Sequence, residues 1–180
     1  MADPGRIHVD LRGTSSWGEA SALAFETRAV HKEFRLERHT INVLNGVSLE
    51  VQRGEWVALV GRSGSGKTTL LQLLGSLDTP TRGEVLCHGR AYSRLSGKQR
   101  AELRRDEIGF VFQSYHLFPE LTAVENVSLS ALQWGWDRAQ AAGRARELLY
   151  SFGLEERLEH RPRELSGGEQ QRVAMARALI

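Results

Sequence analysis

An eight-residue glycine-rich segment constrains this chain more tightly than any other feature. Gly61-Arg62-Ser63-Gly64-Ser65-Gly66-Lys67-Thr68 fits the pattern G-x-x-x-x-G-K-[ST] at every required position. The apolar run 56–60 before it is typical of a buried central strand. Behind it, leucines recur at helical spacing at positions 70, 73, 74 and 77. The sequence therefore predicts a strand, a phosphate-binding loop and a helix in direct succession.

The chemistry of a polyphosphate explains each residue type in this loop. Glycines let successive backbone N–H groups curl around phosphate oxygens, and a helix that starts at about Gly66 directs its positive dipole end at the same anion. Lys67 is expected to reach the outer phosphates, and the Thr68 hydroxyl to ligate Mg2+. The candidate nucleotide-binding residues of the loop are Gly61, Ser63, Gly64, Ser65, Gly66, Lys67, Thr68 and Thr69.

The loop alone does not choose among small GTPases, kinases, recombinases and transport ATPases. The sequence contains no Asn-Lys-x-Asp segment of the kind that reads guanine, so GTP specificity has no support. The choice among the remaining classes depends on the rest of the chain.

Length and composition set the broad class. A chain of 180 residues, with 41% hydrophobic and 26% charged residues, is expected to form one globular domain or a piece of one. Its longest apolar run is far shorter than the roughly 20 residues of a membrane span, and its N-terminus does not resemble a secretory signal. These features predict a cytoplasmic protein. The single cysteine, Cys87, is expected to be a small buried side chain.

Charge and histidine spacing disfavour two other classes of function. The net charge is +2, and the two basic clusters, 98–105 and 157–163, are interrupted by acids. A nucleic-acid partner is therefore not expected. The six histidines show no short metal-ligand spacing, so a zinc site is not supported.

The pattern along the chain changes from strands to helices. Residues 1–29 show no sustained period and are expected to be a loosely ordered extension. Strands are predicted on either side of an Asn45-Gly46 turn within 43–51, at 84–88, and as a short buried strand at 108–112. Helices are predicted from a Ser96 cap to about 106, and over 123–132, 138–152 and 166–180. The order favours an α/β core with a helical subdomain.

A second glycine-bearing turn opens the last predicted helix. In Leu165-Ser166-Gly167-Gly168-Glu169-Gln170, a serine and two glycines stand at the helix N-terminus. Such a turn can receive an anion through the serine hydroxyl and exposed N–H groups. It can equally be a plain N-cap, and taken alone the segment favours the plain cap.

The phosphate loop, a polar Gln113 at a strand end and the Leu-Ser-Gly-Gly-Glu-Gln turn together resemble the ATP-binding subunit of an ATP-binding-cassette (ABC) transporter. Two connecting stretches, 74–83 and 109–127, are most similar to those of the lipoprotein-releasing ATPases and of the macrolide-export and cell-division cassettes. The resemblance implies a P-loop NTPase core with an antiparallel β subdomain and a helical subdomain. It assigns 30–180 to the ATP-binding domain and about 114–165 to the helical subdomain.

The resemblance also implies roles for residues outside the loop. Phe34 matches the aromatic residue that stacks on adenine, with an ordinary core phenylalanine as the alternative. Gln113 matches the glutamine that contacts Mg2+ and the attacking water, and Gln113 and Lys67 are the candidate catalytic residues. Ser166, Gly167, Gly168 and Gln170 match the signature that contacts ATP held by an opposite subunit, which implies a homodimer or pseudo-dimer. Segment 115–121 matches the surface that receives a transmembrane permease on the inner face of the membrane.

One departure limits what these 180 residues are expected to do. In the family a metal-holding aspartate and a catalytic glutamate, the Walker B residues, follow the signature helix, and the present sequence ends within that helix. We therefore expect a C-terminally incomplete cassette that lacks the Walker B residues and is inactive alone, whereas the full-length protein hydrolyses ATP for export or release of a lipophilic or lipoprotein cargo.

Other functions remain open at this point. A cell-division or other non-transport ABC ATPase, or a fragment that only binds nucleotide, fits the same motifs. The short interval between Lys67 and Ser166 disfavours the DNA-repair members, which carry long insertions there. The sequence does not identify the cargo, the direction of work or the permease.

Overall fold

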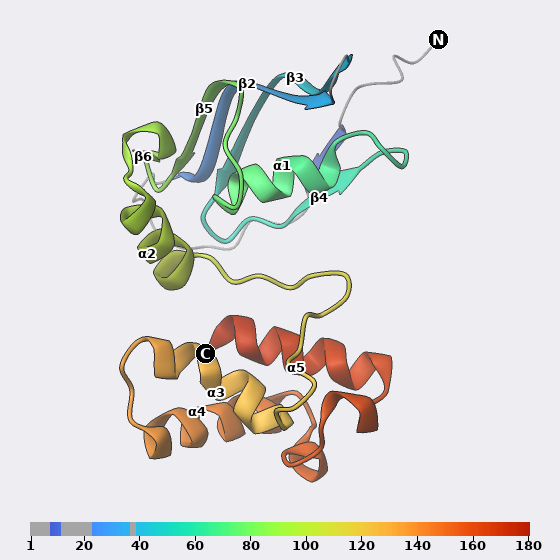
Figure 1. Ribbon diagram of the computed structural model, residues 1–180, viewed down its shortest axis with the longest axis vertical. Helices are drawn as coiled ribbons and strands as arrows, with labels where there is room; N and C mark the ends of the chain where they lie inside the picture. Colours follow the sequence, from blue (N-terminus) through green and yellow to red (C-terminus); the bar gives the residue numbers. More distant parts are fainter. Residues whose placement is uncertain (1–7, 12–22, 37–38) are drawn as a thin grey trace. The chain divides into compact units, whose positions relative to one another are not determined.

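Two structural units make up the chain in the computed structural model, Met1–Glu102 and Leu103–Ile180, and each is described by itself (Figure 1). The structure describes residues 8–11, 23–36 and 39–180. The first unit holds the strands and the phosphate loop, and the second holds three long helices.

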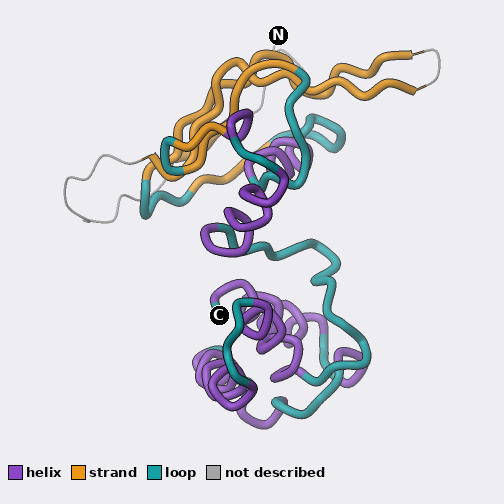
Figure 2. The backbone as a smooth tube through the Cα atoms, turned by 60° about the vertical axis from the view of Figure 1, so that its left-hand side comes forward, coloured by secondary structure: helices purple, strands orange, loops and turns teal. Residues whose placement is uncertain are grey.

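A four-stranded antiparallel sheet organises the first unit. Its strands lie in the order β3 (His39–Gln52), β2 (Leu23–Leu36), β5 (Arg82–Cys87) and β6 (Arg90–Ala91). β2 and β3 run side by side for their whole length, and their tips project beyond the rest of the sheet (Figure 2). This sheet matches the antiparallel β subdomain expected from the sequence.

The core of the first unit forms where helix α1 (Lys67–Leu74) packs on the sheet. Val30, Val85 and Cys87 are completely buried, as are Leu70 and Leu73 of the helix. Complete burial of Cys87 confirms its expected role as a small core side chain. Tyr92, which begins the 3-10 helix η1 (Tyr92–Arg94), donates a hydrogen bond to the carbonyl of Leu74, and burial raises the pKa of its phenol.

A β-bulge replaces the turn that Asn45-Gly46 was expected to form. β3 continues through both residues, and the register against β2 shifts between Thr27 and Val30. Gly46 has φ +69° and Ala29 has φ +45°, and the displaced N–H of Ala29 donates to Ser48 Oγ. The glycine therefore serves a bulge between paired strands, which a local turn signal does not distinguish from a hairpin.

The strand before the phosphate loop is less buried than its apolar sequence predicts. β4 (Val57–Val60) pairs only with β1 (His8–Leu11) in the described part of the chain, and its residues alternate between partly buried and exposed. A central buried strand needs neighbours on both edges, so that prediction is wrong here. The expected loose extension 1–29 is likewise wrong for 8–11 and 23–29, which are strand, whereas 1–7 and 12–22 lie outside the described residues.

Helix α1 ends earlier than its leucine spacing predicts. Ser76 adopts φ +54°, its N–H donates to the carbonyl of Leu73, and the N–H of Leu77 donates to that of Gln72. This pair of bonds is a Schellman motif, which terminates the helix at Leu74. Leu77 thus lies outside the helix and is exposed.

The second unit contains the predicted helices. α3 (Ala123–Gln133), α4 (Arg138–Ser151) and α5 (Gly167–Leu179) pack around a core that includes Val127, Leu149 and Val173. Two 3-10 helices, η2 (Glu155–Arg157) and η3 (Pro162–Glu164), connect α4 to α5. α2 (Gly97–Glu107) bridges the unit boundary in sequence and begins at the expected Ser96–Gln99 capping box.

Residues 108–112 do not form the predicted buried strand. These residues have no regular secondary structure, and Val111 and Phe112 are exposed. A strand needs a partner, and the described residues of the second unit contain none. The prediction of a buried strand from this apolar sequence is therefore wrong.

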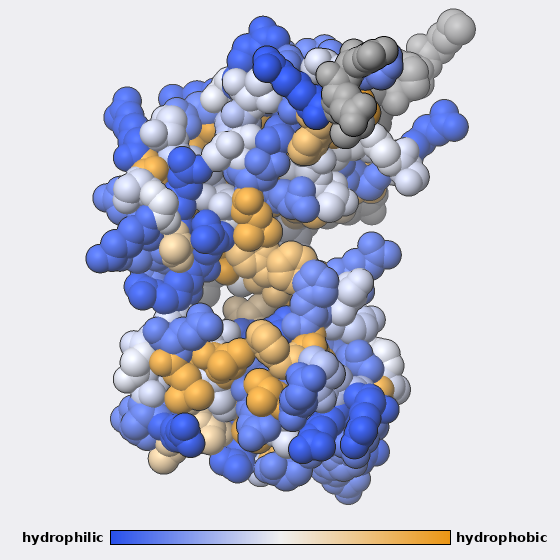
Figure 3. All heavy atoms as spheres, in the orientation of Figure 1, coloured by the Kyte–Doolittle hydropathy of each residue, from blue (hydrophilic) through white to orange (hydrophobic). Residues whose placement is uncertain are grey.

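Exposed apolar side chains occur on the second unit among hydrophilic neighbours (Figure 3). They include Phe118, Trp134, Trp136 and Met175. Across the described ranges, no helix combines the length and the apolar character that a bilayer crossing requires.

Gly83 in β5 gives a test of the bulge. A Cβ there would lie 2.3 Å from the carbonyl oxygen of Ala29, and its φ is +85°, whereas a Cβ on Gly89 meets nothing within 4 Å at a similar φ of +73°. We expect Gly89→Ala to lower the free energy of unfolding by about 1 kcal/mol, the cost of left-handed backbone. Gly83→Ala adds a backbone clash and is expected to cost ~3 kcal/mol or more. Equal losses in urea titrations would contradict the bulge packing.

Candidate nucleotide site

The phosphate loop turns into α1 at Gly66. This residue is the helix N-cap with φ +93° and ψ +5°, a left-handed conformation that favours glycine. A Cβ at this position would lie 2.9 Å from the carbonyl oxygen of Val43 and 2.8 Å from Leu44 Cδ2. Both backbone conformation and space therefore require glycine where the loop becomes a helix, which confirms the expected helix start.

The N-terminus of α1 differs from those of α3 and α5. No side chain caps it, and its first turn contains no acidic residue. α3 and α5 each begin with a capping box, in which a hydroxyl side chain and a glutamate satisfy the first N–H groups. The first N–H groups of α1 thus lack a side-chain acceptor, and the helix dipole favours an anion at this place.

The Lys67 ammonium lies over the loop that it follows. Its Nζ donates to the carbonyl oxygens of Gly61 at 2.9 Å and Arg62 at 2.8 Å, and to Ser65 Oγ at 3.3 Å. The loop carbonyls fix this positive charge on the loop side of the open helix end. A cation and unoccupied N–H groups on one loop form a site for a polyanion.

The remaining loop residues lie at or near the surface. Ser63, Gly64 and Thr68 are exposed, and Thr69 is partly exposed. Across the described residues, the structure contains no cluster of three or more histidine, cysteine or carboxylate side chains that could hold a metal ion. The Thr68 hydroxyl offers an oxygen ligand of the kind that Mg2+ takes together with phosphate oxygens and water, so the loop fits Mg2+ carried by a nucleotide.

Phe34 projects from β2 and is 39% exposed, which is inconsistent with the alternative of a core phenylalanine. One face of its ring is covered by Lys32, whose Nζ lies 5.0 Å from the ring centroid. The same ammonium donates to Asp78 Oδ1 at 2.7 Å and to the carbonyl of Thr79 at 2.8 Å. A partly buried ion pair thus holds the ammonium against one face of the ring, and the other part of the ring is accessible for stacking.

Gln113 is exposed in the second unit and directly follows segment 108–112. Two residues later the chain adopts left-handed backbone without glycine, with φ +57° at Tyr115 and +47° at His116. The guanidinium of Arg177, on α5, donates to both of their carbonyls, at 2.6 and 2.7 Å. Burial lowers the pKa of Arg177, and its two hydrogen bonds stabilise the strained turn beside Gln113.

The Ser166 turn is a complete capping box. Ser166 Oγ accepts from the N–H of Glu169 at 3.3 Å, and one carboxylate oxygen of Glu169 accepts from the Ser166 N–H at 2.7 Å and hydroxyl at 2.8 Å. The plain N-cap weighed from the sequence is therefore present. It does not exclude an anion, because Gly167 and Gly168 remain exposed at the same helix end.

The side chain of Gln170 is bonded within this chain, whereas Gly167 and Gly168 are exposed. Its amide donates to the carbonyls of Pro162 at 2.8 Å and Leu165 at 3.1 Å. These bonds tie α5 to the preceding η3 turn. The side chain of Gln170 therefore supports the turn from within, and its expected contact with ATP of an opposite subunit remains a prediction.

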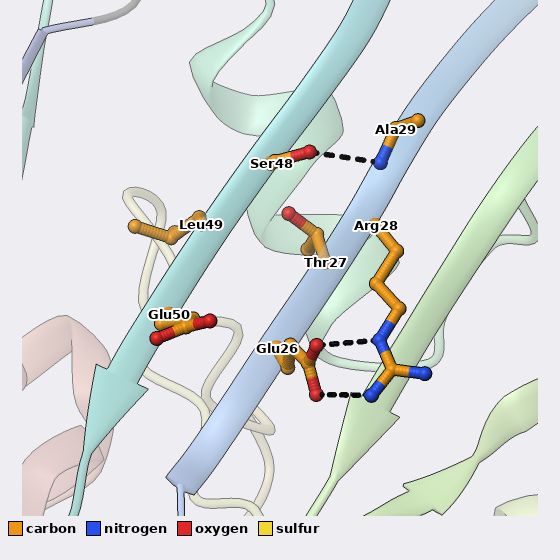
Figure 4. Close-up of a pocket in the computed structure, with 7 residues that line it drawn as sticks. All are labelled: Glu26, Thr27, Arg28, Ala29, Ser48, Leu49 and Glu50. Carbon is orange, nitrogen blue, oxygen red and sulfur yellow. Dashed lines mark hydrogen bonds and ion pairs between the residues drawn. The ribbon is translucent and has the colours of Figure 1, made fainter.

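A shallow hollow on the sheet is not the phosphate site. Seven residues line it: Glu26, Thr27, Arg28, Ala29, Ser48, Leu49 and Glu50 (Figure 4). Glu26 faces Glu50 across the β2–β3 ladder, and the only guanidinium there, that of Arg28, is bound to the Glu26 carboxylate. Two carboxylates and one neutralised cation disfavour a phosphate ligand.

Residues 44–180, which span the phosphate loop, Gln113 and the Ser166 turn, match the family model described as ABC transporter. The chain belongs to the ABC transporter family. Both units of this ABC protein therefore carry segments that the family model covers, the phosphate loop in the first and the Ser166 turn in the second.

Two curated relatives of this ABC protein are ATP-binding proteins of lipoprotein-releasing systems. The lipoprotein-releasing system ATP-binding protein LolD of Myxococcus xanthus is 53% identical over 85% of this chain and 68% of its own length. LolD of Novosphingobium aromaticivorans is 53% identical over 84% of this chain and 68% of its own length. The chain is thus an ATP-binding subunit of the type to which these lipoprotein-release proteins belong.

Solved structures confirm the fold class. The ATP-binding cassette MJ0796, in a dimeric post-hydrolysis state bound to ADP and Pi, superposes with a TM-score of 0.77 at 40% identity. The match covers 86% of this chain and 68% of that chain. A second dimeric structure of MJ0796 gives the same TM-score. The expected P-loop ABC ATPase core is therefore confirmed for this chain.

Three charged residues with a part in these sites were absent from the sequence predictions. Lys32 supports Phe34, Arg177 binds the carbonyls beside Gln113, and Arg157 pairs with Glu169. For Lys32 the spacing of two residues from Phe34 on one strand face was a usable signal. Arg157 and Arg177 act on segments distant in sequence, and no local pattern marks them.

Arg177→Ala tests the support of the Gln113 turn. Loss of two charge-assisted hydrogen bonds to strained carbonyls is expected to lower the free energy of unfolding by about 2–4 kcal/mol and to increase proteolysis near His116. The control Arg144→Ala removes a surface arginine of α4 that pairs with Glu147. It is expected to change the free energy of unfolding by less than ~0.5 kcal/mol. Chemical denaturation and limited proteolysis measure both effects, and equal stability of the two variants would contradict the assignment.

The Ser166 turn predicts a pH dependence. Hydrogen bonds from Ser166, and then from Arg157, lower the pKa of Glu169 from 4.5 to about 2. A depressed carboxyl pKa stabilises the fold above about pH 4.5, and this contribution is lost as the pH falls toward 2. The difference in urea midpoint between the wild type and Glu169→Gln is therefore expected to be largest near pH 7 and to shrink toward pH 2.5. A constant difference across this range would refute the assignment.

Proposed function

We propose that this ABC protein binds Mg-ATP and that, in the full-length protein, ATP hydrolysis drives release or export of a lipoprotein or other lipophilic cargo. The observation that carries the proposal is the α1 N-terminus, which has neither a side-chain cap nor an acid and lies beside the fixed ammonium of Lys67. A helix end of this kind is stabilised by a bound phosphate.

Each part of the nucleotide has a candidate partner in the first unit. The N–H groups of the glycine loop and Lys67 receive the phosphates, the Thr68 hydroxyl holds Mg2+ together with phosphate oxygens, and Phe34 stacks on adenine. Support for the last role comes from the exposed ring, which Lys32 already backs on one face. Mg2+ neutralises charge on the phosphates, so the chain itself needs to supply few ligands.

The Ser166 turn, from here on called the signature turn, is proposed to contact ATP held by a second subunit. Gly167 has an ordinary negative φ, and a Cβ there would meet nothing within 4 Å. Neither the backbone conformation of Gly167 nor its packing in this chain requires glycine. Glycine would be required if a ligand from outside the chain approached the backbone closely at this position. The dimeric MJ0796 cassette, bound to ADP and Pi, supports a two-subunit arrangement.

A membrane partner is proposed to dock near Gln113. Phe118, which follows the turn after Gln113, is exposed. Arg177 stabilises the backbone of that turn by donating to the carbonyl of His116. The names of the LolD relatives support a lipoprotein-releasing system as the setting, with this chain peripheral on the cytoplasmic face and a transmembrane permease as its partner.

Hydrolysis is assigned to the full-length protein. Gln113 is proposed to contact Mg2+ and the attacking water, and Lys67 to stabilise charge on the outer phosphates during transfer. The resemblance places a metal-holding aspartate and a catalytic glutamate after the signature helix. Nucleotide binding is measured on this chain, and ATP turnover on a protein that contains both of these residues.

Lys67→Ala tests the proposal. Loss of the ammonium removes charge-assisted bonds worth about 1.5–3 kcal/mol each, so affinity for a fluorescent ATP analogue is expected to fall at least ~10-fold. In the full-length protein, ATPase activity is expected to be abolished. The matched control is Lys98→Ala on α2, whose side chain is 87% exposed, and it is expected to bind as the wild type does. Equal affinity of the Lys67→Ala and Lys98→Ala variants would rule out the assigned site.

A further inference from the structure

An ion pair lies directly behind the signature turn. Arg157 ends the 3-10 helix η2, and its Nε donates to Glu169 Oε1 of α5 at 2.9 Å. The glutamate side chain is mostly shielded from solvent, with 19% exposed, and the arginine side chain is partly exposed, at 38%. The pair joins the segment before the turn to the first turn of the helix.

The second oxygen of the same carboxylate binds the turn itself. Glu169 Oε2 accepts from the backbone N–H of Ser166 at 2.7 Å and from its hydroxyl at 2.8 Å. One carboxylate therefore receives three hydrogen bonds, one of them from a guanidinium. Such bonds fix the orientation of Glu169 and hold it in its ionised form.

This arrangement sets a condition on the signature serine. A hydroxyl has one hydrogen to donate, and in this structure Ser166 donates it to Glu169. If Ser166 is to donate to a phosphate instead, its bond to Glu169 must be released. The N–H of Glu169 can still bond to Ser166 Oγ, so the serine keeps its position when the hydroxyl hydrogen turns.

The charge of Glu169 sets a second condition. A carboxylate within a few ångströms of a triphosphate repels it, and the repulsion is stronger at a protein surface than in bulk water because the effective dielectric constant is lower. α1 avoids this repulsion because its first turn has no acidic residue. α5 has an acidic residue in its first turn, and Arg157 is paired with that residue.

We infer that Arg157 is a positioning residue for the signature turn: it neutralises and holds Glu169, so that the Ser166 hydroxyl can turn to the outer phosphate of ATP on a second copy of this chain. The inference rests on the proposed function, because it concerns the ATP held between two subunits. It adds a residue outside the glycine-rich motif to the site.

The test separates two steps of nucleotide binding in the full-length protein. Binding to the phosphate loop is measured with a fluorescent ATP analogue at concentrations where the protein is monomeric. Nucleotide-driven dimerisation is measured by sedimentation with a non-hydrolysable ATP analogue. Arg157→Gln is expected to leave the first affinity within about twofold and to weaken dimerisation at least ~10-fold, since an unpaired carboxylate then faces the phosphates. Arg157→Lys is expected to fall between the Arg157→Gln variant and the wild type.

Matched variants isolate the role of the pair. Arg146→Gln removes the same charge from a more exposed pair with Glu159, at 3.7 Å in the same unit, and is expected to dimerise as the wild type does. Glu125→Gln alters the equivalent capping box of α3, at a helix end to which no ligand is assigned, and is expected to have no effect on dimerisation.

A double variant keeps the inference falsifiable if Arg157→Gln also lowers stability. Glu169→Gln removes the charge that Arg157 neutralises, so the combination Arg157→Gln with Glu169→Gln is expected to dimerise better than Arg157→Gln alone. Wild-type dimerisation of Arg157→Gln, or a double variant no better than the single one, would overturn the inference. Unchanged ATP-analogue affinity in the Lys67→Ala variant would instead overturn the proposed function, so the two failures are distinct.

Discussion

The left-handed backbone at Gly66 is the constraint on which the site depends. It lets α1 begin directly beneath Val43 and Leu44 of β3, where a Cβ would have no room. Because the helix starts there without a side-chain cap, its first N–H groups remain available beside the Lys67 ammonium. The sheet and α1 thus position an anion site that no single local feature would form.

The two glycine-bearing helix ends of this ABC protein differ in how they are capped and charged. α1 presents an uncapped, acid-free end, whereas α5 presents a closed capping box in which Arg157 neutralises the carboxylate of Glu169. The first end can bind phosphate within one subunit. The second has its own internal acceptor, and in our account it engages a phosphate only when a second subunit brings one close. This difference gives a physical reason for the proposed completion of the site by dimerisation.

The sequence predicted those parts of the structure that depend on local signals. The phosphate loop, the start of α1 and the helices from Ala123 onward follow from glycine positions, caps and apolar spacing within one turn or two. Predictions failed where a partner decides the outcome. In the described residues, β4 has one neighbouring strand and 108–112 has no strand partner. Asn45-Gly46 lies in a bulge opposite β2. Arg157 and Arg177 were missed for the same reason, since their partners are distant in sequence.

The most direct test of this account is an amide NMR titration of the chain with Mg-ATP at concentrations where it stays monomeric. We predict that the amide signals of 61–69 shift on nucleotide binding and that those of Ser166 to Glu169 do not. The Ser166 signals should move only when dimerisation is promoted at higher protein concentration. Shifts at Ser166 in the monomer, or none in the phosphate loop, would contradict the division between an open and a closed helix end.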